Sequence, residues 1–188
     1  SSGDAIAAGL GMVHQHFMQV PSMTVAENLI LGAENGSPFK VDRKKAVEIT
    51  RELSERYNLK VEAEEKVEDI SLAMRQKLEI LKALYRGAHI LILDEPTAVL
   101  TPQETEELFE QLLLLKESGH TIIFISHKLN EVKALCNRMT ILRDGKTMGT
   151  YEISDLDEHE ISRLMVGREV SLDIEKAEAD FGKTVFSV

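Results

Sequence analysis

Apolar residues gather in short runs that predict strands. Residues 90–93 and 121–125 are almost unbroken apolar runs, which is typical of strands buried on both faces of a sheet. The weaker candidates are residues 9–14, which precede Gln15, and residues 139–142 and 146–151, which flank a tight turn at Asp144-Gly145.

Longer amphipathic segments with polar starts predict helices. Thr24 with Glu27, and Thr101 with Glu104, have the spacing of a capping box, and Ser71 is a third candidate cap. The predicted helices are residues 24–31, 42–57, 72–85, 101–116 and 128–136. Strands that alternate with helices after residue 89 predict a parallel sheet in an α/β fold. We expect the helical block inserted before that alternation to form its own lobe.

Composition narrows the function classes. Among the 188 residues, 43% are hydrophobic and 29% are charged, as in ordinary globular domains. The net charge of −10 argues against nucleic acid as the main partner, because binding to the phosphate backbone needs clustered Lys and Arg. Cys136 is the only cysteine, so a disulfide framework is excluded and a reducing cytosol is expected. The apolar runs are too short to span a bilayer, so any membrane association is expected through a protein partner.

Two carboxylates directly follow the apolar run at residues 90–93. Asp94 and Glu95 would lie at the carboxyl end of a buried strand, where ligands bind in open α/β sheets. There Asp94 could hold Mg²⁺ through water, and Glu95 could polarise an attacking water molecule. For these residues alone, a solvated acidic turn closed by Pro96 is an equally good interpretation.

Five motifs in a fixed order resemble those of the ABC ATPases. Gln15 with the preceding strand is similar to the Q-loop, and residues 70–76 occupy the place of the signature sequence. Residues 90–97 resemble Walker B with the catalytic glutamate, residues 98–101 the D-loop, and His127 the switch histidine. The resemblance implies a P-loop NTPase (RecA-like) core of parallel strands with an inserted α-helical subdomain, incomplete at the N-terminus.

Further segments resemble a narrower group, the first cassette of the tandem ATPases that serve sugar and nucleoside importers. They are residues 25–28, 79–84, 96–104, 127–132 and 165–168. The stretch Val13-His14-Gln15-His16-Phe17 leans towards the nucleoside type.

The resemblance implies catalytic roles for Gln15, Glu95 and His127, with Asp94 and Gln15 at Mg²⁺ and ATP as the nucleotide. Without that context, Gln15 is a polar residue at a strand end. His127 is likewise explained without it, as a residue at a helix N-terminus capped by Ser126.

A second set of residues is implied to contact nucleotide held by the opposite cassette. They are Ser71, Leu72, Ala73, Arg75, Gln76, Leu100 and Thr101. Ser71 both caps its helix and places a helix N-terminus towards the γ-phosphate. Thr101 is interpreted as a structural cap, with a contact to the second cassette as the alternative. Ala73 stands where the family commonly has glycine, and Arg75 adds a positive charge beside it, which puts this composite site in doubt.

The phosphate-binding loop has no counterpart in the 188 residues. Gly182-Lys183-Thr184 is rejected as a Walker A motif, because Ala177 stands where its first glycine belongs. We therefore expect an internal fragment that is inactive by itself. The expected domains are residues 1–23 (core strand and Q-loop), 24–88 (helical subdomain), 89–168 (RecA-like core) and 169–188 (linker to a second cassette, with a strand beginning at residue 184).

The resemblance implies the ATP-hydrolysing subunit of an importer on the cytoplasmic face of the cell membrane. Its partners would be a second cassette, permease subunits and, indirectly, an extracytoplasmic solute-binding protein, with no nucleic acid. Two alternatives stay open. A non-transport ABC protein would show long heptads between its motifs or a basic linker, and a non-catalytic scaffold is allowed by Ala73.

Overall fold

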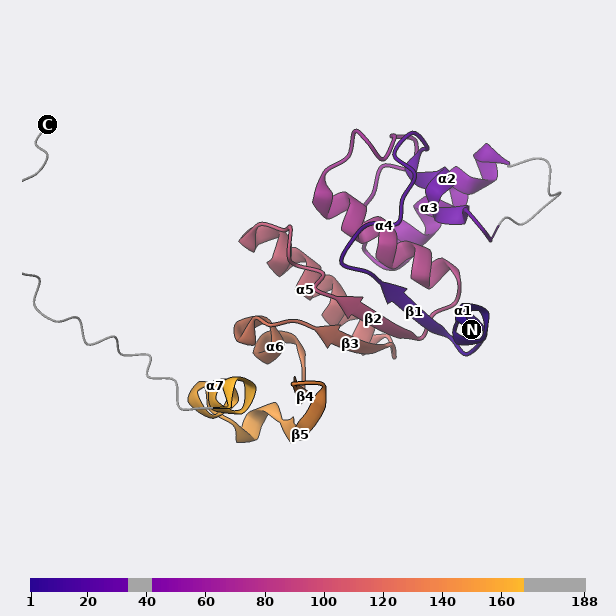
Figure 1. Ribbon diagram of the computed structural model, residues 1–188. Coiled ribbons are helices and arrows are strands. Elements are labelled where there is room, and N and C mark those ends of the chain that lie inside the picture. Colours follow the sequence, from indigo (N-terminus) through magenta and orange to yellow (C-terminus); the bar gives the residue numbers. More distant parts are fainter. Residues whose placement is uncertain (34–41, 168–188) are drawn as a thin grey trace, which may run out of the picture. The chain divides into compact units, whose positions relative to one another are not determined.

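A computed structural model describes residues 1–33 and 42–167 of the chain (Figure 1). Contacts divide the chain into two compact units, Ser1–Cys136 and Asn137–Val188, and each is described by itself. Within the described residues, no helix is both long and apolar enough to cross a membrane.

The first unit is built on a parallel sheet with strand order β1 (Leu10–Val13), β2 (Ile90–Asp94) and β3 (Thr121–Ile125). Leu10 pairs with Ile90, and Ile90 pairs with Thr121. Both pairings are parallel, which confirms the parallel sheet that the sequence predicts. Because all three strands run the same way, the residues that follow them meet at one edge of the sheet.

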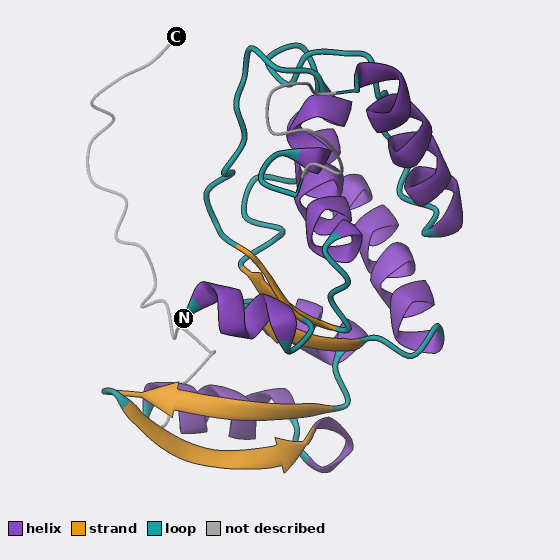
Figure 2. Ribbon diagram, turned by 90° about the vertical axis from the view of Figure 1, so that its right-hand side faces the viewer, coloured by secondary structure: helices purple, strands orange, loops and turns teal. Residues whose placement is uncertain are grey.

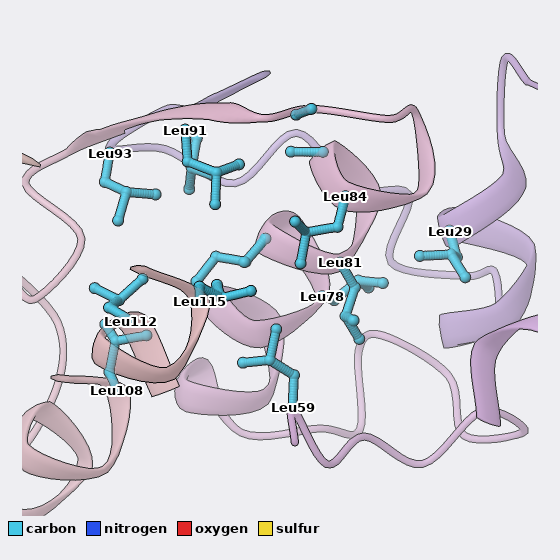
Figure 3. Packing of buried hydrophobic residues seen from close by; sticks show 14 of the residues in the cluster. Leu29, Leu59, Leu78, Leu81, Leu84, Leu91, Leu93, Leu108, Leu112 and Leu115 are labelled. Atoms are coloured by element: carbon cyan, nitrogen blue, oxygen red, sulfur yellow. The ribbon is translucent and has the colours of Figure 1, made fainter. Parts of the chain in front are cut away.

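Burial alternates along these strands, which corrects the prediction that they are buried on both faces. Val13, Leu91 and Leu93 are fully buried, whereas Met12 is 45% exposed and Ile123 is 47% exposed. Leu91 and Leu93 point towards leucines of the helices α4 (Leu72–Tyr85) and α5 (Pro102–Glu117) (Figure 3). The described helices therefore cover mainly one face of the sheet. The prediction failed because apolar residues occur on both faces of these strands.

The predicted helix starts are confirmed by their hydrogen bonds. Thr24 forms a capping box with Glu27 before α2 (Val25–Ile30), and Thr101 forms one with Glu104 before α5. Ser71 caps α4 by accepting from the Met74 backbone N–H. The other helices of the first unit are α1 (Ser2–Ala7), α3 (Arg43–Arg56) and α6 (Leu129–Leu135).

One hydrophobic cluster joins the helical block to the sheet. Leu29, Leu59, Leu78 and Leu81 of the block and Leu91 of β2 are all fully buried in it (Figure 3). Complete burial of such side chains stabilises a fold by about 1.5–3 kcal/mol each. The helical block thus shares its core with the sheet, although Ala26, Ile30, Ala46 and Ala63 also form a small cluster of their own. The domain boundaries given above stay a prediction.

Small side chains bring α4 close to β1. A Cβ atom on Gly11 would lie only 2.8 Å from the Cβ atoms of Ala83 and Ala88. Real Cβ atoms essentially never approach so closely, so the contact depends on glycine at this position.

The second unit begins with the antiparallel hairpin of β4 (Arg138–Arg143) and β5 (Lys146–Glu152), seen in Figure 2 as two long orange strands. Asp144 and Gly145 have φ angles of 51° and 72°, as the predicted tight turn requires. The 3₁₀ turn η1 (Ile153–Asp155) leads to α7 (Glu158–Val166), which contacts β4. The loop at residues 35–38, the strand from residue 184 and the linker at 169–188 lie outside the described residues.

Candidate functional site

Three segments far apart in the sequence meet at the Glu95 carboxylate. The Gln15 side-chain amide, just after β1, donates to Oε2 of Glu95 at 3.1 Å. The Nδ1 atom of His127, just after β3, lies 3.0 Å from Oε1 of the same residue. For Nδ1 to donate to a carboxylate it must carry the proton, which in the neutral ring leaves Nε2 as an acceptor. The structure therefore brings the three predicted catalytic residues into contact.

The backbone of Glu95 has an unusual conformation that aims its side chain. Its φ angle is +45°, in the left-handed region that costs a non-glycine residue roughly 1–2 kcal/mol. The Glu95 N–H donates to the carbonyl of Ile125 on β3 at 3.0 Å, which fixes the residue against the sheet. Such strain at the centre of a polar cluster is typical of a functional position.

Asp94 is the last residue of β2 and is partly exposed. Among the described residues, its carboxylate has neither a hydrogen bond nor an ion pair, so it is available to a ligand. The described part of the chain contains no group of three His, Cys, Asp or Glu side chains that could hold a metal by themselves. Mg²⁺ needs only one or two carboxylates when phosphate oxygens and water complete its shell. Asp94 supplies one such carboxylate, and the side-chain amide oxygen of Gln15 could be a second oxygen ligand.

Behind the cluster lies a buried polar network that sequence analysis missed. Thr97 is only 2% exposed, and its hydroxyl lies 2.7 and 2.8 Å from the two carboxylate oxygens of Glu131. Ser126 also donates to Glu131, at 3.0 Å, and Lys128 forms an ion pair with it at 2.9 Å. Burial raises the pKa of the Glu131 carboxyl, but hydrogen bonds from Lys128, Thr97 and Ser126 together outweigh it and leave the pKa below its ordinary value.

One alternative interpretation of His127, as a residue at a helix N-terminus capped by Ser126, is wrong. Ser126 is not the N-cap of this helix; Lys128 is, and its side chain makes no capping bond. The Ser126 hydroxyl instead accepts from the Lys128 N–H at 3.1 Å while donating to Glu131. Glu131 is an acidic residue in the first turn of α6, and this position was the sequence signal that could have indicated its role.

The residues predicted around the start of α4 differ in their exposure and contacts. Ser71 and Leu72 are exposed and leave the first turn accessible, with Ala73 partly buried. Arg75 is folded back: its guanidinium donates to the Glu68 carbonyl at 3.3 Å, and its own carbonyl accepts from Gln19 at 2.7 Å. The Gln76 side chain is buried, at 3% exposure. Among the described residues, no hydrogen bond joins this group to Glu95.

The contacts of Leu100 and Thr101 are with the hydrophobic cluster and with a helix cap. Leu100 packs against the main hydrophobic cluster, and Thr101 is exposed at the cap of α5. The Thr101 hydroxyl donates to Glu104 at 2.9 Å. Hydrogen bonds from the Thr101 backbone N–H and hydroxyl lower the pKa of Glu104, and the opposing effect of burial on this pKa is smaller. The capping role expected of Thr101 is confirmed.

Comparison with known proteins identifies the relatives of the chain. It is 50% identical over 179 residues to the nucleoside import ATP-binding protein NupA of Lactococcus lactis, and 49% identical over 180 residues to the guanosine import ATP-binding protein NupO of Bacillus subtilis. It is 41% identical to the ribose import ATP-binding protein RbsA 3 of Rubrobacter xylanophilus. These matches cover 95%, 96% and 99% of the chain, but only 35%, 35% and 38% of the relatives. The chain thus spans about a third of the length of these curated relatives.

Solved structures and a family comparison agree on the fold. A nucleotide-free ATP-binding cassette of an ABC transporter matches 87% of this chain and 67% of its own length, with a TM-score of 0.68 and 22% identity. A second ATP-binding cassette, in its ADP conformation, has the same TM-score and identity and matches 87% of this chain and 66% of its own length. The α/β fold with a parallel sheet is therefore the ATP-binding cassette fold of the P-loop NTPases. The model of the family described as "ABC transporter" matches residues 2–98, more than half of the chain. The chain belongs to the ABC transporter family.

Proposed function

We propose that these residues are part of the ATP-hydrolysing subunit of an importer for nucleosides or simple sugars. The observation that carries the proposal is the convergence of Gln15 and His127 on the strained Glu95, at the carboxyl edge of a parallel sheet. The import ATP-binding proteins among the relatives support the same function. We call the longer protein proposed to contain this chain the parent protein.

In this proposal, Glu95 polarises the water that attacks the γ-phosphate of ATP. His127 donates from Nδ1 to Oε1 of Glu95, and its Nε2 side can face the phosphate. Gln15 holds the other carboxylate oxygen, so the two side chains fix the direction of the base. Asp94 and Gln15 would hold Mg²⁺, which neutralises phosphate charge when it is bound.

The proposed partner at the other surface is a second ATP-binding cassette. The exposed start of α4 at Ser71 offers free N–H groups and the positive end of a helix dipole to a phosphate held by that cassette. The Ala73 methyl group narrows this approach. Arg75 is turned towards Glu68, and Gln76 is buried, so Ser71, Leu72 and Ala73 are the members best placed for that contact.

Nucleosides are favoured over sugars as the solute. The nucleoside and guanosine import proteins are 50% and 49% identical to the chain, whereas the glucose and ribose import proteins are 41% identical. We further propose that the parent protein binds permease subunits at the cytoplasmic face of the membrane and, through them, serves an extracytoplasmic solute-binding protein.

The proposal is tested by steady-state ATP hydrolysis in the parent protein, with any second cassette disabled. Glu95→Gln should keep ATP binding and lower the rate by roughly 100-fold or more, because an amide cannot act as the general base. Glu107→Gln removes an equally negative but exposed side chain, whose only ion pair in the described residues is a long one with Lys77, and should leave the rate unchanged.

Unchanged hydrolysis in Glu95→Gln would assign Glu95 to a structural turn, and no hydrolysis by the wild type would favour the scaffold alternative. The solute is assigned separately. Cells lacking the gene should lose uptake of labelled nucleosides and keep uptake of ribose and glucose; the reverse pattern would assign a sugar importer.

A further inference from the structure

His127 lies between two residues that bind the same buried carboxylate. Ser126 donates its hydroxyl to Glu131 at 3.0 Å, and Lys128 forms an ion pair with Glu131 at 2.9 Å. The Lys128 N–H also donates to the Ser126 hydroxyl at 3.1 Å, which leaves that hydroxyl hydrogen free to point at Glu131. The side chains of both residues that flank His127 thus bind one carboxylate.

The same carboxylate holds the segment that follows Glu95. The Thr97 hydroxyl shares its hydrogen between both oxygens of Glu131, at 2.7 and 2.8 Å, and the Lys128 ammonium lies 3.5 Å from the Thr97 carbonyl. Thr97 and Glu131 are 2% and 8% exposed. Breaking one of these contacts would leave buried polar groups unpaired, so the network resists distortion.

We propose that Glu131 is a positioning residue, which sets the separation of His127 from Glu95 by tying the segment after β3 to the segment after β2. This inference rests on the proposed function of Glu95 and His127. Glu131 touches neither of them directly; it acts through Ser126 and Lys128 on one side and through Thr97 on the other. Its effect should be on hydrolysis and not on nucleotide binding, since it fixes groups that act at the γ-phosphate.

A buried ion pair elsewhere in the chain separates positioning from simple stabilisation. Glu79 is also 8% exposed, and its side chain pairs with Lys82 three residues later, at 3.2 Å. The Glu131 and Lys128 pair has the same spacing and an equal side-chain exposure of 10% for the carboxylate. Glu79 makes no described contact with the Glu95 cluster, so Glu79→Gln is a matched control.

The first measurement is independent of ATP hydrolysis. Nuclear magnetic resonance of the 188-residue chain records the imidazole resonances of His127. The Glu95→Gln variant shows how these resonances shift when the contact with the carboxylate is lost. Glu131→Gln and the milder Ser126→Ala should shift these resonances in the direction seen for Glu95→Gln. Glu79→Gln should leave them unchanged even if it lowers thermal stability as much. Unshifted His127 resonances in both Glu131→Gln and Ser126→Ala would overturn the inference.

The second measurement is kinetic and uses the parent protein. Glu131→Gln should lower kcat by about 10- to 100-fold, the scale expected when a catalytic group is misplaced by about 1 Å, with little change in KM for ATP. Glu79→Gln should keep kcat. If the wild type does not hydrolyse ATP but the resonances shift as expected, the positioning role stands and the proposed function fails. If the wild type hydrolyses ATP and Glu131→Gln matches it, the positioning role fails and the proposed function stands.

Discussion

The side-chain nitrogen of Gln15 lies 3.1 Å from Oε2 of Glu95, although 80 positions separate the two residues in the sequence. Parallel pairing of β1 with β2 explains the contact. Val13 pairs with Leu93, so the chain leaves both strands at the same level of the sheet and the next residues are neighbours. The Ile125 carbonyl then fixes Glu95 from the third strand.

Replacing Glu95 with asparagine should give a more stable chain than replacing it with glutamine. The φ angle of +45° disfavours glutamate, whereas asparagine adopts it more readily, as Asn58 does here at 53°. Relative to Glu95→Gln, which loses the same carboxylate without relief of strain, Glu95→Asn should raise the free energy of unfolding by up to about 1 kcal/mol. Urea denaturation of the three proteins measures this, and equal stability of the two variants would show that the backbone is not strained.

Adding one methyl group at Gly11 should destabilise the chain. The new Cβ atom would lie 2.8 Å from the Cβ atoms of Ala83 and Ala88, so α4 or β1 must move. Overpacking of this kind costs about 1–3 kcal/mol, which thermal unfolding of Gly11→Ala would show as a lower Tm. Gly3→Ala is the control, because its nearest neighbour would be the Ser1 hydroxyl at an ordinary 3.7 Å. A Tm for Gly11→Ala equal to that of the wild type would contradict the close packing.

Glu131 should make stability depend on pH in a defined direction. Its folded pKa is below its ordinary value, since the hydrogen bonds from Lys128, Thr97 and Ser126 outweigh the effect of burial. Such a group stabilises the fold fully above its unfolded pKa, and this contribution is lost as the pH falls through the lower folded pKa.

The measurement is the free energy of unfolding of the wild type and of Glu131→Gln over a series of pH values. The advantage of the wild type should be largest near neutral pH and should shrink under acid conditions. An advantage that is constant across the series would mean that the charge of Glu131 does not contribute.

The apolar edge strand should promote association of the 188-residue chain. β3 is an edge of the three-stranded sheet, and its Ile123 and Ile125 are 47% and 45% exposed. An exposed apolar edge is a template for pairing with another chain, so light scattering should detect concentration-dependent association. Ile123→Lys should reduce it, whereas Gln103→Lys, which adds the same charge on exposed α5, should not. Equal association of both variants would place the contact elsewhere.

Local signals predicted much of the fold. Capping pairs such as Thr24 with Glu27 gave correct helix starts, because both partners lie within one turn of the chain. The turn at Asp144 and Gly145 was also readable from its residue types. The helix α1 was not predicted, although Ser1 and Asp4 form its capping box, since six residues show too little periodicity. The helix α7, capped by Asp157, was not predicted either.

The residues of the Glu95 cluster were predicted from the sequence, but the buried network around Glu131 was missed. Glu95 and His127 follow apolar runs and stand in a known order of motifs, so they were visible in the sequence. The role of Glu131 depends on contacts with Thr97, 34 residues away, and with Ser126, and no local pattern encodes them. Gln76 shows the opposite case, because a position within a motif did not reveal that its side chain is buried.

The close contact at Gly11 fixes the C-terminal end of α4 against β1. Ala83, near the C-terminal end of the helix, contacts the strand, and Ser71 is the N-cap at the opposite end. The two residues are twelve positions apart, which is about 18 Å at the rise of an α-helix. Sliding of α4 along β1 would bring Ala83 level with Leu10 or Met12, which carry side chains, so the contact at Gly11 sets the position of α4 along the strand. A tilt of about 3° at Gly11 would displace Ser71 by about 1 Å, a small rotation amplified at the end of α4 that is proposed to meet a phosphate.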